Sequence, residues 1–75
     1  MSARRRIRDL RMDHGWSQKQ VAQKLHMSQT GYSKYETGEN EIPLPILEQL
    51  ADLYHTSVDY LLGRTKVDRP YPSDR

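Results

Sequence analysis

The sequence predicts one small, all-α domain of five short helices, and three observations support this fold class. The chain has 75 residues and no Cys, which suits a single domain without a disulfide framework. Its apolar residues recur at helical spacing. Ser residues stand where helices can begin and Gly residues where they can end. The mean hydropathy of −0.97 indicates a thin core that uses nearly every large apolar side chain.

The first expected helix runs from about residue 3 to residue 14, and Gly15 follows as the residue that ends it. One stripe of this helix consists of Ile7, Leu10, Arg11 and His14. Arg11 needs a partner if it is buried on that stripe. The N-terminal end is crowded by Arg4, Arg5, Arg6 and Arg8. These cations lie at the positive end of the helix dipole, as a solvated basic tail or as a site for an external anion such as DNA phosphate.

Two helix starts that lie eleven residues apart organise residues 17–38. Ser17 and Ser28 can each cap a helix, and Gln20 gives the first start the spacing of a capping box. We therefore expect helices over residues 18–25 and 29–37, with a sharp corner between them. A left-handed residue would suit this corner, and His26, which stands there, tolerates that conformation better than bulky residues do.

The helix expected over residues 29–37 has two different faces. Its inner side carries Tyr32, Tyr35 and Glu36. Its outer side carries only polar or basic side chains, namely Gln29, Thr30, Ser33 and Lys34. Base edges in the DNA major groove are read by such side chains from a helix, although a solvated surface helix would show the same pattern.

The remainder of the chain predicts two more helices and a tail. An acidic loop, residues 39–42, precedes a fourth helix with Pro43 and Pro45 in its first turn. The buried stripe of that helix comprises Ile46, Leu47, Leu50, Ala51 and Tyr54. Ser57 caps a fifth helix over residues 58–62, and Gly63 closes it. We expect a domain over residues 1–63 and an extended or disordered tail over residues 64–75, which contains two prolines.

Charge is distributed unevenly along the chain. Residues 1–34 hold eight Lys/Arg and two Asp/Glu, net +6, and residues 35–75 hold four and eight, net −4, which sum to the overall +2. Positive charge beside a polar helix start favours a polyanionic partner over a merely soluble surface. His14, His26 and His55 show no ligand spacing, so we expect no metal and no cofactor. Without Cys or an apolar run of membrane length, we expect a cytoplasmic, nucleoid-associated protein with no membrane partner.

Three segments carry a family resemblance: WSQKQVAQKL at residues 16–25, MSQTGYSKYETG at 27–38 and SVDYLLG at 57–63. Together they resemble the Cro and phage-repressor type of helix-turn-helix domain, often called the XRE family, over Ile7 to Gly63. The resemblance implies a compact five-helix, lambda-repressor-like fold whose second and third helices form the helix-turn-helix. The helix that starts at Ser28 would lie in the major groove. Base-edge contacts would come from Gln29, Thr30 and Lys34.

The resemblance implies further roles. Gln18 matches a position that contacts a phosphate and braces the first recognition residue, and Arg11 and Glu36 match a buried ion pair of some members. We expect contacts to the DNA backbone from Gln18, Lys19, Ser33, Thr37, Asn40, Arg6 and Arg8. The sequence departs from the family in two places. His26 stands where Gly is usual, and the loop after Gly38 carries Glu39 and Glu41 where Lys or Arg is common. Phosphate contact by that loop would rest on backbone N–H groups, Thr37 or Asn40.

These observations predict a sequence-specific DNA-binding transcriptional regulator, a repressor that binds a palindromic double-stranded operator as a homodimer. The alternative is an antitoxin-like or other protein-interaction module, in which the Arg64–Arg75 tail wraps a protein partner. We do not expect an enzyme, because the sequence offers no Ser/His/Asp set, carboxylate pair or phosphate loop.

Overall fold

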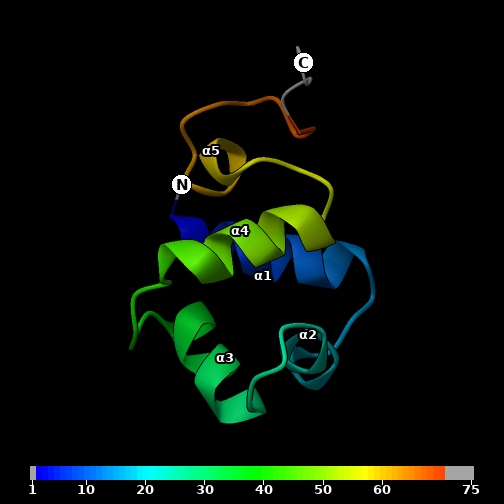
Figure 1. The fold of residues 1–75 in the computed structure, drawn as a ribbon, viewed down its shortest axis with the longest axis vertical. Helices are drawn as coiled ribbons and strands as arrows, with labels where there is room; N and C mark the ends of the chain where they lie inside the picture. Colours follow the sequence, from blue (N-terminus) through cyan, green and yellow to red (C-terminus); the bar gives the residue numbers. More distant parts are fainter. Residues whose placement is uncertain (1, 71–75) are drawn as a thin grey trace.

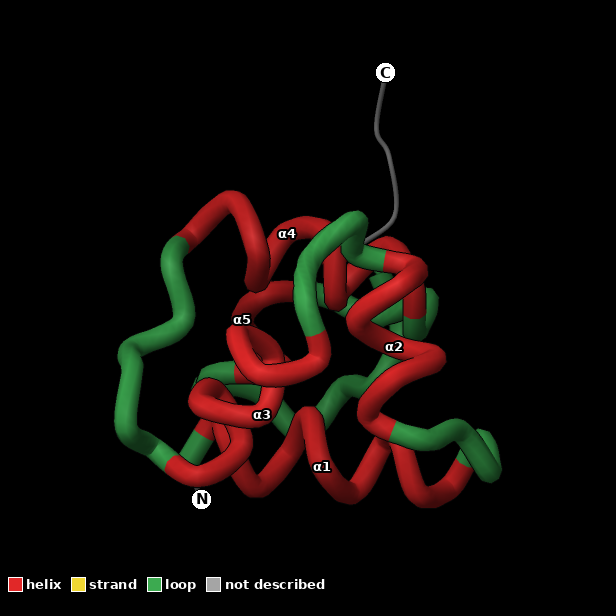
Figure 2. The backbone as a smooth tube through the Cα atoms, turned by 90° about the horizontal axis from the view of Figure 1, so that it is seen from below, coloured by secondary structure: helices red, strands yellow, loops and turns green. Residues whose placement is uncertain are grey.

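The computed structural model describes residues 2–70, which form five α-helices joined by short loops (Figure 1). The helices are α1 (Ala3–Asp13), α2 (Gln18–Lys24), α3 (Gln29–Thr37), α4 (Leu44–Leu53) and α5 (Val58–Leu61). Figure 2 shows only helices and loops over this range, so the predicted all-α fold class is confirmed. Residues 64–70 contain no helix or strand, and the rest of the expected tail, residues 71–75, lies outside the described residues.

The helix bounds differ from the expected ones by a residue at several ends. His14, Leu25 and Leu62 are C-cap residues, so α1, α2 and α5 each end one residue earlier than predicted. Pro43 is the N-cap of α4, because its backbone is extended with φ −63° and ψ 151°. Only Pro45 lies in the first turn of that helix, where its missing N–H costs little.

The predicted helix starts are present as hydrogen bonds. The Ser17 hydroxyl accepts from the Gln20 N–H, and the Gln20 side-chain oxygen accepts from the Ser17 N–H at 2.8 Å, which completes the capping box. The Ser28 hydroxyl accepts from the Gly31 N–H at 3.0 Å. His26 adopts the expected left-handed conformation at the α2–α3 corner, with φ 58°. His55 does the same between α4 and α5, with φ 54°, which the sequence analysis did not single out.

All five helices contribute side chains to the core, and α1 and α4 cross the middle of the molecule (Figure 1). The buried side chains of the core are Ile7, Val21, Ala22, Leu25, Tyr32, Leu47, Leu50, Ala51, Tyr54 and Leu61. Helices α2 and α3 lie at one end of the molecule and α5 at the opposite end. Tyr35, predicted on the inner side of α3 with Tyr32, is half-buried and packs against this core. Within the described part of the chain, none of the helices has the length and apolar character that a membrane crossing requires.

Candidate nucleic-acid interface

The outer face of α3 carries the three side chains that the sequence assigned to base contacts, together with Ser33, which it assigned to the DNA backbone. Gln29 and Thr30 are exposed in the first turn, and Ser33 and Lys34 follow one turn later, half-buried. Their side chains have no hydrogen-bond partner within residues 2–70. Donors and acceptors on this face are therefore free to bind a ligand.

These four residues line one shallow hollow of about 410 Å³, together with a fifth residue that the sequence analysis did not assign to the site, Glu39. Glu39 lies just beyond Gly38, whose left-handed backbone (φ 85°) ends α3. The sequence signal for Glu39 is its place directly after the helix-ending glycine. For this loop the sequence predicts only phosphate contact, by groups other than the Glu39 carboxylate. The hollow thus combines amide, hydroxyl, ammonium and carboxylate groups on one surface.

The inner face of α3 is fixed by the carboxylate of Glu36, whose side chain is only 3% exposed. Arg11 donates to it from Nε at 2.7 Å and from Nη2 at 3.0 Å. Gln18 donates its side-chain N–H at 3.0 Å, and the Tyr32 hydroxyl donates to the same carboxylate. The ion pair that the sequence predicted is therefore present, and it is part of a larger network that joins α1, α2 and α3.

This network shifts the pKa of the Glu36 carboxyl. Burial alone would raise the pKa, but the hydrogen bonds from Arg11, Tyr32 and Gln18 favour the charged form and bring the pKa below its ordinary value. Burial and the bond to Glu36 also raise the pKa of the Tyr32 hydroxyl. The pair therefore keeps a charged carboxylate and a neutral phenol at neutral pH.

Arg4 makes a second contact between α1 and α3, which the sequence analysis did not find. Its Nη1 donates to the Thr37 carbonyl oxygen at 2.9 Å, where it satisfies a carbonyl at the negative end of the α3 dipole. A Cβ at Gly38 would lie 2.3 Å from that Nη1, so glycine also leaves room for the contact. Arg4 and Arg11 lie seven residues apart, on the same side of α1, and this spacing was the available signal.

Other predicted site residues have different surroundings. The Gln18 side-chain N–H binds Glu36, and no hydrogen bond joins Gln18 to Gln29, the residue that it was expected to brace. The guanidinium carbon of Arg6 lies 4.0 Å from the ring centroid of Tyr60 in α5, at the end of the molecule away from α3. Asn40 donates its backbone N–H to the Lys34 carbonyl at 3.1 Å. Arg6 is thus away from the hollow, whereas Asn40 lies next to two residues that line it, Lys34 and Glu39.

The three remaining predicted residues stay accessible. Lys19 is exposed in the first turn of α2, and Arg8 is exposed on α1 between the two arginines that contact α3. Thr37 is exposed at the end of α3, and its hydroxyl donates to the Lys34 carbonyl at 3.2 Å. Their exposure leaves all three side chains accessible to an external ligand.

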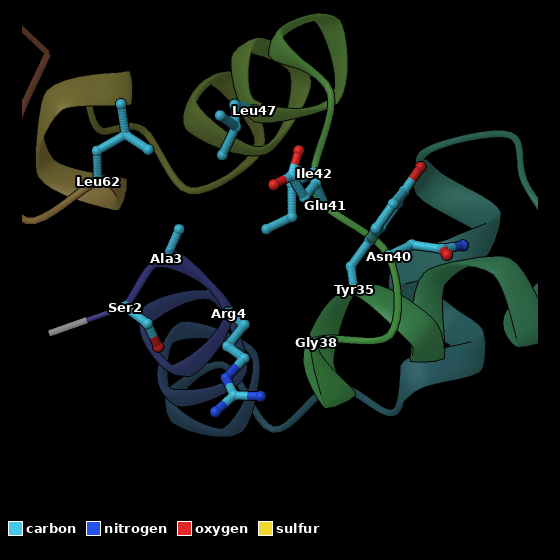
Figure 3. Close-up of a pocket in the computed structure, with 10 residues that line it drawn as sticks. All are labelled: Ser2, Ala3, Arg4, Tyr35, Gly38, Asn40, Glu41, Ile42, Leu47 and Leu62. Carbon is cyan, nitrogen blue, oxygen red and sulfur yellow. The ribbon is translucent and has the colours of Figure 1, made fainter.

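A second pocket of about 260 Å³ lies between the start of α1, the α3–α4 loop and α5 (Figure 3). Asn40 and Glu41 line it beside apolar side chains such as Ile42 and Leu62. It does not share a lining residue with the hollow on α3. Over residues 2–70, no group of three or more His, Asp or Glu side chains could hold a metal ion.

Comparisons with known proteins agree with this geometry. A helix-turn-helix family model matches residues 7–61. The chain is similar to the HTH-type transcriptional regulator ImmR of Bacillus subtilis (strain 168), with 34% identity over 99% of this chain and 58% of that protein. It is similar to the uncharacterized HTH-type regulator YobD of the same organism, with 42% identity over 89% of this chain and 58% of that protein.

A phage protein is also similar. The cryptic phage CTXphi transcriptional repressor RstR of Vibrio cholerae is 34% identical over 91% of this chain and 61% of that protein. The chain therefore spans about three-fifths of the length of these curated relatives.

We predict that Arg11→Met destabilises the protein by about 3–5 kcal/mol, because it leaves the buried Glu36 carboxylate without its charged partner. The measurement is the free energy of unfolding from urea denaturation. Arg8→Met is the matched control, since it removes the same charge from an exposed position of α1 and should change stability by less than about 0.5 kcal/mol. Equal effects of the two substitutions would contradict a structural role for the ion pair.

We also predict an acid-dependent loss of the Glu36 contribution. Because the folded-state pKa of Glu36 is lowered, its stabilisation is complete above the ordinary Glu value of about 4.3 and is lost as pH falls through the folded value. The stability advantage of the wild-type protein over Glu36→Gln should therefore shrink on acidification below that value. Glu48→Gln, at an exposed position of α4, is the charge-matched control. An advantage independent of pH would contradict the prediction.

Proposed function

Because this chain belongs to the helix-turn-helix family, of the Cro and phage-repressor type, we propose that it is a sequence-specific DNA-binding transcriptional regulator. The outer face of α3 carries this proposal. Its polar side chains have no internal partners, whereas its inner face is held by the Glu36 network. A rigid helix with an unoccupied polar face suits direct reading of base edges in the major groove.

Base contacts are proposed for Gln29, Thr30 and Lys34. The Gln29 amide can pair with the N6 and N7 edge of adenine, and Lys34 can meet a guanine or a phosphate. Contacts to the DNA backbone are proposed for Lys19, Arg8, Ser33 and Thr37. Ser33 lines the hollow, and the other three are exposed. For Gln18 the backbone contact is proposed through the second N–H of its side-chain amide, because Glu36 engages the first. Arg6 and Asn40 stay in the proposed set as contacts outside the hollow, because Arg6 packs on Tyr60 of α5 and Asn40 lines the second pocket.

We also propose that the protein represses transcription and that two copies of it bind one operator. One curated relative is named a transcriptional repressor, and blocking a promoter needs no chemistry beyond occupancy. A single α3 of nine residues reaches few base pairs, so two copies on a palindrome would lengthen the site. The half-sites would then lie about one helical turn apart, roughly 10 base pairs.

Selection of bound sequences from a random duplex pool tests this function. We expect one palindromic sequence to be enriched, with half-sites separated by about one helical turn. Sedimentation on that duplex should show two protein copies per DNA. Enrichment of a single half-site with one copy at saturation would contradict pairing. A pool that remains random would contradict sequence-specific binding.

We further predict that Gln29 contributes to the sequence specificity of DNA binding and that Lys19 contributes to affinity for any duplex. Gln29→Ala should cost about 1–3 kcal/mol of binding free energy on the selected duplex and little on a scrambled one. Lys19→Ala should weaken both and reduce the salt slope by about one unit, because it removes a phosphate contact. The measurement is affinity for both duplexes across a salt series.

Two exposed residues outside the proposed interface supply the controls. Gln49→Ala removes a glutamine side chain from α4 and is the control for Gln29→Ala. Lys66→Ala removes a lysine charge from the segment after α5, which lies at the end of the molecule opposite α3. Both should bind like the wild-type protein. Equal weakening of both duplexes by Gln29→Ala would mean that the assigned face does not read bases.

A further inference from the structure

Glu39 introduces a carboxylate into the hollow on α3, where it stands beside Ser33 and Lys34. Its backbone N–H donates to the Thr37 hydroxyl oxygen at 3.4 Å, and its Oε1 lies 3.4 Å from the same hydroxyl, whose single proton the nearer Lys34 carbonyl at 3.2 Å also accepts. These weak contacts keep the residue close to the last turn of α3. Although Lys34 and Glu39 border the same hollow, they do not form an ion pair with each other. Both charges therefore remain available to a ligand.

The hydrogen-bonding capacity of Glu39 differs from that of every other residue in the hollow. Lysine only donates, and the amide and hydroxyl side chains donate and accept, whereas an ionised carboxylate only accepts. In the major groove, guanine and thymine present acceptor atoms, but cytosine N4 and adenine N6 are amino donors. A carboxylate at this edge is therefore attracted to an exocyclic amino group and repelled by acceptor edges.

Electrostatics also argue against a phosphate as the ligand of this residue. Glu39 and Glu41 both lie in the loop between α3 and α4, and residues 39–43 contain no Lys or Arg. A phosphate placed within hydrogen-bond reach of the Glu39 carboxylate would face like charge. An amino edge is thus the DNA feature that matches the chemistry of Glu39.

We propose that Glu39 is a specificity-determining residue, which accepts a hydrogen bond from the exocyclic amino group of cytosine or adenine at the base pair next to the one that Lys34 meets. This inference rests on the proposed function. It adds to the base-reading set a residue beyond the end of α3, held there by the left-handed turn at Gly38. Lys34 would donate to an acceptor atom of one base pair, and Glu39 would accept from an amino group of the adjacent base pair. Together they would distinguish these two base pairs from pairs with other donor and acceptor patterns in the major groove.

The test compares sequences selected from a random duplex pool by the wild-type protein, Glu39→Ala and Glu39→Gln. The wild-type protein should enrich cytosine or adenine at one position of each half-site, and the enriched base identifies the source of the amino group. Glu39→Ala should reduce that preference by roughly 10-fold while the other positions keep theirs. Glu39→Gln should accept additional bases at the same position, because an amide also donates.

Glu41→Gln is the matched control, because it removes the same charge two residues further on, at a side chain that lines the other pocket (Figure 3). It should keep the wild-type preference at every position. If both Glu39 variants enrich the wild-type sequence and bind all duplexes more tightly, Glu39 only repels phosphate, and the inference is wrong while the proposed function stands. If the wild-type protein itself enriches no sequence, the proposed function fails and this inference fails with it.

Discussion

The rest of the structure depends on the hydrogen bonds that the buried carboxylate of Glu36 accepts. It accepts hydrogen bonds from Arg11 of α1, Gln18 of α2 and Tyr32 of its own helix. An isolated helix of nine residues is marginal in water, so α3 takes its orientation from such contacts rather than from its own propensity. Because the charge is buried, losing any one donor leaves part of it unsatisfied. The network therefore favours a single arrangement of the three helices.

Helix α1 holds α3 at two points. Arg11 binds Glu36 inside the protein, and Arg4 binds the carbonyl of Thr37 near the surface. Two contacts separated by two turns of α1 restrain both the position and the tilt of α3, which one contact would not do. The basic N-terminal half of the chain thus has a structural use as well as an electrostatic one. Arg4 and Arg11 use their charge to hold α3. The exposed basic side chains of this half are available to a polyanion.

Local signals in the sequence predicted the elements, but contacts between distant residues were harder to find. Ser17, Ser28 and Gly38 mark helix ends by side-chain chemistry or by backbone freedom, and both act within a few residues. The contact of Arg4 spans 33 residues, and an arginine near a helix start looks the same whether it is solvated or bound. The contact of Arg6 with Tyr60 was missed for the same reason, since Tyr60 lies in α5. The Arg11–Glu36 pair was found because a cation on an apolar stripe requires a partner, and the family resemblance supplied one.

The two faces of α3 are chemically independent, and this has a consequence for how such a protein can change. Residues that orient the helix point inward, and the outer side chains of Gln29, Thr30, Ser33 and Lys34 contribute no hydrogen bond to the described fold. Replacing the outer set therefore breaks none of the hydrogen bonds that hold α3 in place. Duplicated copies of such a gene can therefore diverge toward different operators one substitution at a time, with each intermediate still folded.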